Sequence, residues 1–468
     1  MGIKKSVMPE NMTSEYQRFI RSKVRSTKSF GFAASEHLNG HLFDWQRRIV
    51  DWALRRGRAA IFADCGLGKT LMQLEWASKV HQNSGGNVLL HCPIGVREQT
   101  LREAAKFEID CNVYVADSMD DVKPGIALVN YEKIHKFETT DFVGVVLDES
   151  SILKNFTGTT KRSLVQDWKH ADYRLACTAT PAPNDHMELG NHAEFLGIMP
   201  SNEMLSRWFI NDTMKAGGYR LKSHGQRDFW HWVTTWAACI CKPSDIGGDD
   251  SGYELPEMHE HLHVVTDEAK PADGFLFNNF ALNATNVHKQ KRNTAQQRAE
   301  LVASIADVYE PWVVWCDTNY EADELKKAIP TATEVRGSDS DKSKQQKLTS
   351  FTNGDINTLI TKPSVAGLGM NWQHCSHTAF VGLSYSFEAF YQAVRRFYRF
   401  GQSKPVNVHI IEGDGESSLR EATLRKRQQF EQMQRGMAEA VQGLQLQDEI
   451  MRETYEPTKK MELPQWLT

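Results

Sequence analysis

The chain has 468 residues, 40% of them hydrophobic and 24% charged, with a formal net charge of −4. This length is too great for a single hydrophobic core and predicts two or three globular domains. The sequence has no apolar run long enough to cross a membrane and no signal-peptide core. Its eight cysteines are scattered without a C-x-x-C pair, which argues against a zinc site and indicates reduced, cytoplasmic thiols.

The local distribution of charged residues is compatible with nucleic-acid binding but does not require it. Basic residues gather at 47–58, 289–292 and 420–427, although the whole chain is slightly acidic. Because charges act mainly within a Debye length of roughly 8–10 Å, a basic groove can exist on an acidic protein. Composition therefore neither predicts nor excludes a nucleic-acid partner.

The most specific pattern lies at 59–77, AAIFADCGLGKTLMQLEWA. Its first five residues have the length of a buried strand, and the residues after Lys69 have helical periodicity. Between them, Gly66 and Gly68 let backbone N–H groups close around an anion at the helix N-terminus. Lys69 is then placed to reach the β- and γ-phosphates, and Thr70 to hold Mg²⁺. The segment predicts a phosphate-binding loop.

Further short apolar runs lie at 87–92, 126–129, 143–147 and 174–178. They alternate with helical stretches, which predicts a parallel sheet flanked by helices.

The third of these runs ends in two acids. Asp148 is placed to hold the Mg²⁺ shell, and Glu149 to polarise an attacking water. Adjacent acids after a strand are common on protein surfaces, but downstream of a phosphate loop they indicate the catalytic pair of an ATPase.

A Trp-rich segment follows, from Pro183 to about Met258. Positions 229, 232, 233 and 236 within it have helical spacing, which favours core packing over a base-stacking platform. Gly247 to Gly252 forms a turn-rich acidic linker. The stretch from 286 to 308 then predicts a helix that leads into the next domain.

The segment 392–402, QAVRRFYRFGQ, contains three arginines among large apolar residues. As a continuous helix it would place Arg396 and Arg399 on one face and Arg395 on another. A solvated charged face is the alternative for an isolated helix. A long amphipathic helix after residue 417 has two open roles, contact with DNA or a brace between domains.

The blocks around these residues resemble, in order and over about residues 40 to 412, those of superfamily 2 helicases and translocases. Among these, the Swi/Snf-related DNA-dependent ATPases are most similar. The resemblance rests on LFDWQRR (Q motif), ADCGLGKT (motif I), VLLHCPIGVREQTLREAAKF (Ia), ALVNYEKI (Ib), LDESSILKN (II), LACTATPAPN (III), WVVWCDTNYEADEL (IV), ITKPSVAGLGMNWQ (V) and QAVRRFYRFGQ (VI).

The resemblance implies an α/β fold with two tandem RecA-like lobes, each a parallel sheet flanked by helices, and a C-terminal helical extension. We expect an N-terminal segment at 1–40 and a first, ATP-binding lobe at 41–258, which includes the Trp-rich helical segment from about 183. A second lobe is expected at 259–412 and a helical tail at 413–468.

The resemblance also assigns roles to residues, with ATP and Mg²⁺ as cofactors. It implies that Gln46 contacts the adenine, and that Thr70 and Asp148 hold Mg²⁺. Arg396 and Arg399 match arginine fingers that face the nucleotide from the other lobe, whereas Arg395 is expected to make a structural or DNA contact. The nucleotide-binding set is Gln46, Gly66, Gly68, Lys69, Thr70 and Gly369, and the catalytic set is Glu149, Asp148, Lys69, Arg396 and Arg399.

Motif II departs from the Swi/Snf pattern, whereas motifs V and VI agree with it. Ser151 stands where the Swi/Snf pattern has His, which predicts altered coupling between motifs II and III. Asn371 agrees with the Swi/Snf pattern, as does the ending Arg-Phe-Gly-Gln, and both favour DNA over RNA.

The predicted function is an ATP-dependent motor on duplex or branched DNA. A strand-separating DNA or RNA helicase and a nucleotide-gated binding switch are the alternatives. We expect a monomer on DNA, in a bacterial or phage-infected cytoplasm, with replication or recombination proteins as partners and no membrane association.

Overall fold

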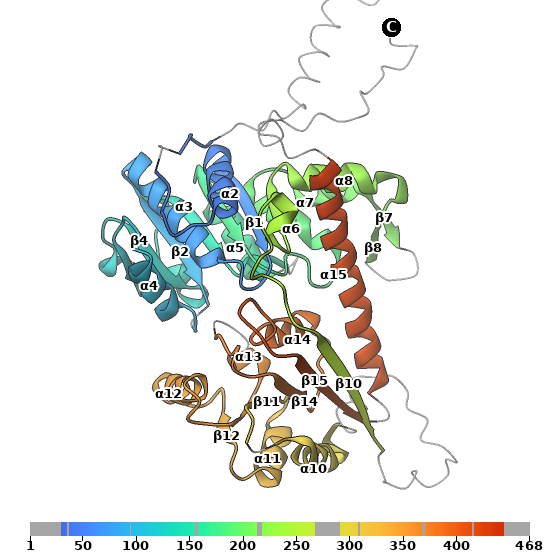
Figure 1. Cartoon of the computed structure of the whole chain (residues 1–468). Helices are drawn as coiled ribbons and strands as arrows, with labels where there is room; N and C mark the ends of the chain where they lie inside the picture. Colours follow the sequence, from blue (N-terminus) through green and yellow to red (C-terminus); the bar gives the residue numbers. More distant parts are fainter. Residues whose placement is uncertain are drawn as a thin grey trace, which may run out of the picture.

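Two parallel β-sheets divide the protein into two lobes, which lie one above the other in Figure 1. The computed structural model describes residues 30–34, 37–93, 95–154, 158–212, 218–266, 291–307, 309–366, 370–413 and 416–443. Each sheet is flanked by helices, so the α/β fold with tandem RecA-like lobes is confirmed. Within these ranges, no helix combines the length and apolar composition that crossing a lipid bilayer requires.

The first sheet has the strand order β3-β4-β2-β5-β6-β1-β9. Its strands are β1 Arg58–Ala63, β2 Asn87–Cys92, β3 Val113–Val115, β4 Ile126–Asn130, β5 Phe142–Asp148, β6 Tyr173–Cys177 and β9 Ala237–Ile240. All five apolar runs singled out in this part of the sequence are therefore strands. Continuous burial explains this result, because strands covered by helices on both faces consist of unbroken apolar residues.

The helices of the first lobe cover both faces of this sheet. They are α2 Asp44–Arg56, α3 Lys69–Ser84, α4 Arg97–Lys106, α5 Thr159–Asp167, α6 Leu189–Leu196, α7 Ser201–Trp208 and α8 Gln226–Thr234. Short 3₁₀ turns lie at Met119–Asp121 (η1), Tyr131–Lys136 (η2), Thr139–Asp141 (η3), Ser150–Lys154 (η4), His186–Glu188 (η5), Ser223–Gly225 (η6) and Pro243–Ile246 (η7). A small antiparallel hairpin, β7 Phe209–Asp212 with β8 Gly218–Leu221, interrupts the Trp-rich segment.

The tryptophans of that segment lie in the core, as the helical spacing predicts. Trp208, Trp230, Trp232 and Trp236 are all at most 8% exposed. Trp208 and Trp232 stack with their ring centroids 4.7 Å apart. A base-stacking platform would need exposed rings, so these four side chains stabilise the lobe instead.

The second sheet has the strand order β10-β15-β14-β11-β13-β12. Its strands are β10 Met258–Val265, β11 Trp312–Trp315, β12 Thr333–Val335, β13 Thr358–Thr361, β14 His377–Phe380 and β15 Val406–Gly413. Its helices are α10 Ala295–Ile305, α11 Asn319–Ala328, α12 Asp341–Thr352, α13 Pro363–Ala366 and α14 Phe387–Val394. The helix predicted at 286–308 is represented by α10, and its first residues lie outside the described ranges.

A long helix, α15 Ser417–Gly443, runs beside both lobes from α8 to the region of β10 (Figure 1). Phe430, Met433 and Met437 on this helix are buried in the same hydrophobic cluster as the Trp-rich segment of the first lobe. Nearer its start, Arg427 forms an ion pair with Glu260 of β10 in the second sheet. Of the two roles left open by the sequence, the structure thus shows the brace.

The helix of motif VI is shorter than predicted. It ends at Val394, and Arg395 is its C-cap. The residues that follow form turns, in which the N–H of Arg396 donates to Ala393 O and that of Arg399 to Phe397 O. The continuous helical register assumed for 392–402 is therefore wrong, and the positions of the three arginines must be taken from their contacts.

Candidate nucleotide-binding site

The phosphate-binding loop lies between β1 and α3, where the sequence predicts it. Gly66 and Gly68 have φ of 89° and 75°, in the left-handed region that glycine adopts without strain. A Cβ on Gly68 would lie 2.5 Å from Nε2 of Gln46, so a larger residue there would displace the Gln46 amide that supports the loop. Lys69 is the first residue of α3, and its Nζ donates to Ala63 O (2.8 Å) and Asp64 O (3.2 Å). The N-terminus of α3 and the Lys69 ammonium thus lie together at the loop.

Gln46 supports this loop from α2. Its Nε2 donates to Leu67 O at 3.0 Å, and its Oε1 accepts from the N–H of Phe43 at 2.9 Å. The side chain is 3% exposed, and both ends of its amide are used within the protein. Contact with adenine stays a prediction for Gln46, and the structure adds a role in fixing the conformation of the loop.

Asp148 and Glu149 lie at the carboxyl end of β5, in the same sheet as β1, so the two motifs share one edge. Burial, together with the Glu149 carboxylate, raises the pKa of Asp148 to about 7. Glu149 has φ of 58°, a conformation that costs a non-glycine residue on the order of 1–3 kcal/mol. Such strain is typical of functional sites. Thr178 of motif III donates to Glu149 Oε2 at 3.2 Å, which orients the carboxylate.

These residues fit ATP with Mg²⁺. The glycine loop and the start of α3 present backbone N–H groups to an anion, and Lys69 adds a positive charge. The two adjacent acids leave excess negative charge in a buried position, which a divalent cation would compensate. Thr70 follows Lys69 on the first turn of α3, where a hydroxyl ligand is expected. Bound Mg²⁺ would supply charge neutralisation of the phosphates.

The motif VI arginines are held by motif V. Arg396 donates from Nε to Gln392 O at 3.2 Å and from Nη1 to Met370 O at 3.3 Å. Arg399 donates to Oδ1 of Asn371. Arg396 is buried and Arg399 is half-buried; burial lowers the pKa of Arg396, and it lowers that of Arg399 to about 10. Charges at such positions act more strongly than at an exposed surface.

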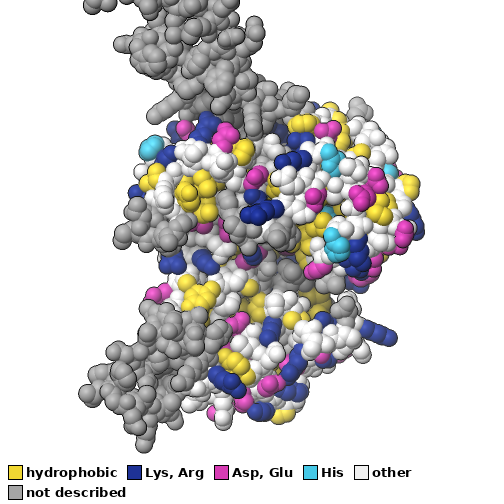
Figure 2. Space-filling view, turned by 180° about the vertical axis from the view of Figure 1, so that it is seen from behind, with side chains coloured by type: hydrophobic (Ala, Val, Ile, Leu, Met, Phe, Trp, Pro, Cys, Tyr) yellow, Lys and Arg dark blue, Asp and Glu magenta, His cyan; other side chains and the backbone are white. Residues whose placement is uncertain are grey.

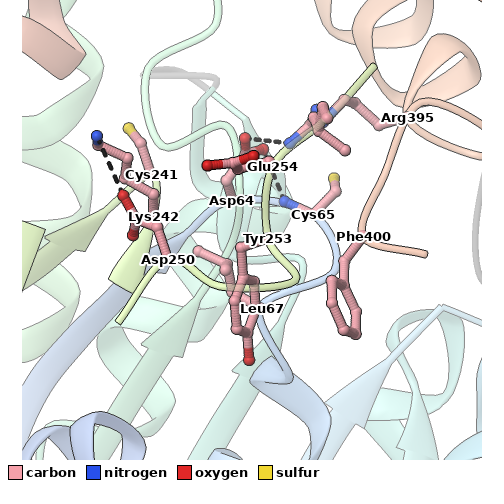
Figure 3. Close-up of a pocket in the computed structure, with 11 residues that line it drawn as sticks. Asp64, Cys65, Leu67, Cys241, Lys242, Asp250, Tyr253, Glu254, Arg395 and Phe400 are labelled. Atoms are coloured by element: carbon pink, nitrogen blue, oxygen red, sulfur yellow. Dashed lines mark hydrogen bonds and ion pairs between the residues drawn. The ribbon is translucent and has the colours of Figure 1, made fainter. Parts of the chain in front are cut away.

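Motif VI touches the phosphate loop across the boundary between the lobes. An added Cβ on Gly66 would lie 3.4 Å from Phe400 Cβ and 3.8 Å from Arg399 Cβ. Arg395 forms an ion pair with Asp64 in the loop, and the Phe400 ring stacks on Tyr253 at 4.6 Å (Figure 3). Of the two contacts expected for Arg395, structural or with DNA, the structure shows the first.

A second set of contacts between the lobes centres on Glu388 of α14. Its carboxylate forms an ion pair with Lys154 of motif II and accepts from Oγ1 of Thr180 in motif III at 3.4 Å. Motifs II and III are also joined directly by the contact of Glu149 with Thr178. Motifs II and III are therefore linked through these contacts, although Ser151 stands where the Swi/Snf pattern has His.

Several residues at this boundary were not found from the sequence. Asp64 and Phe400 belong to quoted motifs but received no role. Glu388 and Tyr391 lie just before motif VI, and Tyr253 lies just after the predicted acidic linker. The pocket in Figure 3, about 380 Å³ in volume, brings Tyr253 and Phe400 together with Asp64 beside the loop. The signal available in the sequence was the charge of Asp64 inside a loop meant to bind phosphates.

Some of the basic residues noted in the sequence are held by acidic partners within the fold. Lys291 is 2% exposed and pairs with Asp317 at 2.9 Å. Arg420 pairs with Glu412 at 3.1 Å. Gly369, predicted to bind nucleotide, and Asn155 of motif II lie outside the described residues.

Two parallel-sheet lobes with a phosphate loop, paired acids and arginines at their boundary form the arrangement that the resemblance to superfamily 2 helicases implies. Residues 296–401 match the helicase conserved C-terminal domain, which covers the second lobe from α10 to the end of motif VI. This match supports the resemblance to superfamily 2 helicases over the second lobe.

Two solved structures are similar to this chain. One is the Sulfolobus solfataricus SWI2/SNF2 ATPase core in complex with dsDNA, with 16% identity, a TM-score of 0.42 and coverage of 91% of this chain and 99% of that chain. The other is a fragment of a putative HsdR subunit of a type I restriction enzyme from Vibrio vulnificus YJ016. It has 15% identity and a TM-score of 0.50, and the match covers 80% of this chain and 64% of that chain. At this identity, the second similarity shows the fold alone.

Replacing Glu149 by Gln is expected to leave ATP binding intact while lowering kcat by about 10²-fold, because an amide cannot polarise the attacking water. The amide keeps an oxygen for the Thr178 hydroxyl, so the local structure should be preserved. Steady-state turnover and nucleotide binding, measured on the same preparation, test this. Glu132→Gln, at an exposed acid on η2, is the matched control and should turn over normally. Loss of ATP binding in Glu149→Gln would instead assign Glu149 a structural role.

Replacing Asp148 by Asn is expected to stabilise the nucleotide-free protein at pH 8. The folded pKa of about 7 lies above the ordinary value of about 3.9, so the folded state binds more protons between these values. The free energy of unfolding therefore falls as pH rises from about 4 to about 7, and the penalty is complete above that range. Thermal melting should give a higher Tm for the variant at pH 8 and a smaller difference near pH 5. Asp141→Asn, at an exposed acid before the same strand, is the control; equal pH dependence in both variants would contradict the assignment.

Proposed function

We propose that this protein is an ATP-dependent motor that moves along or remodels duplex or branched DNA by hydrolysing ATP between its two lobes. The observation behind this proposal is the contact of motif VI with the phosphate loop, where Phe400 and Arg399 lie against Gly66. A nucleotide in that loop would face residues of both lobes, so hydrolysis and relative motion of the lobes would be linked.

Each residue of the site then has a distinct task. Lys69 and the glycine loop bind the phosphates, and Thr70 and Asp148 hold Mg²⁺. Glu149, oriented by Thr178, orients and polarises a water. Arg399 and Arg396 stabilise charge that develops on the γ-phosphoryl oxygens.

A surface for the DNA backbone is proposed on motifs Ia, Ib, IV and V. In the first lobe, Arg97 of motif Ia and Lys133 of motif Ib both contact Asp117, at 2.8 and 2.6 Å. They follow β2 and β4, which are neighbours in the sheet, so the two motifs present adjacent basic side chains. On the face in Figure 2, acidic and basic side chains are interspersed over both lobes. Backbone contact through a few local charges agrees better with this distribution than attraction by one large basic face.

The preference for DNA rests on Asn371 and on the Arg-Phe-Gly-Gln ending of motif VI, both similar to the Swi/Snf pattern. Asn371 contacts Arg399, so this motif V residue is also part of the catalytic arrangement. A strand-separating helicase remains the second candidate, and a nucleotide-gated binding switch the third. The switch is least favoured because Lys69, Asp148, Glu149, Arg396 and Arg399 are all present.

The deciding experiment measures ATPase activity of the full chain without nucleic acid and with single-stranded DNA, duplex DNA, forked DNA and RNA. Stimulation by duplex or forked DNA of arbitrary sequence is expected, since a translocase contacts phosphates rather than bases. Affinity should fall steeply with salt for the same reason. Displacement of a third strand from a triplex, without separation of the duplex, would favour the translocase over the helicase. Absence of ATPase activity in every condition would overturn the proposal.

A further inference from the structure

Asp64 begins the phosphate-binding loop and is held in place by both lobes. Its backbone N–H donates to Ile240 O at 2.9 Å, which fixes it to β9 of the first lobe. Its carboxylate accepts from the N–H of Cys65 at 2.7 Å and from the Tyr391 hydroxyl at 2.6 Å, and it pairs with Arg395. Two of these three donors belong to the second lobe.

Those two donors come from one end of one helix. Tyr391 lies on α14 and Arg395 is its C-cap, four residues later, so both side chains reach the same carboxylate. Burial raises the pKa of Tyr391 well above its usual range, so its hydroxyl remains a donor. Burial alone would lower the pKa of Arg395, but the surrounding acidic groups, with Asp64 the strongest among them, together raise it. The helix end is matched in charge and geometry to Asp64.

The charge of Asp64 matters because of where it lies. Asp64 is 9% exposed and Arg395 is 8% exposed, and a carboxylate buried to that degree is strongly unfavourable without a partner. The same carboxylate stands in the loop that receives a triphosphate, where an uncompensated negative charge would repel the ligand. Separation of the lobes would remove Tyr391 and Arg395 together and leave only the Cys65 N–H.

We propose that Arg395 and Tyr391 form a latch on Asp64, which lets the phosphate loop retain nucleotide only while the two lobes are closed. With the latch made, the negative charge of Asp64 is neutralised and the loop binds phosphates. With the lobes apart, the free carboxylate weakens nucleotide binding and promotes release. Arg395 is thus a positioning residue that acts through Asp64, distinct from Arg396 and Arg399, whose guanidinium groups contact motif V and main-chain acceptors of their own lobe. The latch rests on the proposed function, because it assumes that the loop binds nucleotide.

The test measures binding of the fluorescent nucleotide mant-ADP to the full chain in the presence of Mg²⁺. Arg395→Ala should weaken binding by about tenfold or more, because it leaves the Asp64 charge unopposed in the loop. Asp64→Asn should bind no more weakly than wild type. In the double variant, Asp64→Asn with Arg395→Ala, the affinity for mant-ADP should return to within about threefold of wild type. Such non-additive effects are expected of residues in direct contact.

Restoration by the second substitution separates the latch from a merely structural role. If Arg395 only stabilised the fold, the double variant would bind as weakly as Arg395→Ala or more weakly, and the latch would be overturned. Should Arg395→Ala fail to fold by thermal melting, Tyr391→Phe decides in its place. Loss of that one hydroxyl should weaken binding measurably, and Asp64→Asn should again restore it. Arg425→Ala, at an exposed arginine of α15, is the matched control.

Failure of the latch and failure of the proposed function give different results. No mant-ADP binding by the wild type would overturn the function. Normal binding by the wild type, lost in Lys69→Ala but unchanged in both Arg395→Ala and Tyr391→Phe, would retain the function and overturn the latch alone.

Discussion

Lys69→Ala is expected to abolish ATP turnover, with kcat lowered by at least about 10²–10³-fold. The ammonium is the positive charge at the N-terminus of α3, and its position is set by Ala63 O and Asp64 O at the end of β1. Without it, the β- and γ-phosphates would face only backbone N–H groups and the helix dipole. ATPase assays at saturating ATP and nucleic acid measure the effect.

The control for Lys69 lies on the same helix. Lys79 pairs with Glu75 at 3.7 Å, nearly three turns from the loop. Lys79→Ala should retain turnover but lower the Tm, because the buried Glu75 carboxylate loses this partner. Near-normal turnover in Lys69→Ala would remove the motor assignment altogether. Equal losses in both variants, accompanied by a lower Tm, would point to damage of α3 rather than of the site.

Local features of this site could be predicted from the sequence because each is encoded by neighbouring residues. The phosphate loop needs a buried strand, glycines and a helix start, all present within 59–77. The run at 87–92 coincides with β2 because an apolar stretch between helices has few alternatives to a buried strand. The three-residue β3 was missed, since so short and half-buried a segment has no clear periodicity.

Contacts between the lobes could not be predicted in the same way. Asp64 and Arg395 are 331 positions apart, and nothing in either segment alone specifies their pairing. The end of α14 at Val394 was missed for a related reason. Residues 395–402 lack proline and have acceptable helical periodicity, yet tertiary contacts with motif V and the phosphate loop replace further helical turns.

Among the described residues, links of different chemistry join the lobes at this boundary. Glu388 joins motifs II and III to α14, Asp64 joins the loop to the end of α14, and Phe400 packs against Gly66. In addition, α15 packs on the first lobe and pairs with β10 of the second, which limits how far the lobes can separate. Such a brace favours a hinged motion, in which all three links form and break together.

Arg399→Ala is expected to lower kcat by about 10³-fold or more while the KM for ATP stays within a few-fold. A finger acts on charge that develops in the transition state, so its loss affects turnover more than ground-state binding. Arg399→Lys should restore little activity, since a point charge does not reproduce the planar fork that Asn371 orients. Basal and nucleic-acid-stimulated kcat and KM, measured for each variant, test this.

Alanine variants of the neighbouring Arg396 and Arg395 provide the comparison for Arg399→Ala. Arg396→Ala should resemble Arg399→Ala in kcat, with thermal melting as a check, because its guanidinium also bonds to Met370 O inside the second lobe. Arg395→Ala should differ in kind, raising KM through Asp64 more than it lowers kcat. This contrast follows from the observed contacts, because α14 ends at Val394 and helical phase does not set the positions of the arginines. A raised KM with unchanged kcat in Arg399→Ala would show that Arg399 contributes only to nucleotide binding, and the finger assignment would be wrong.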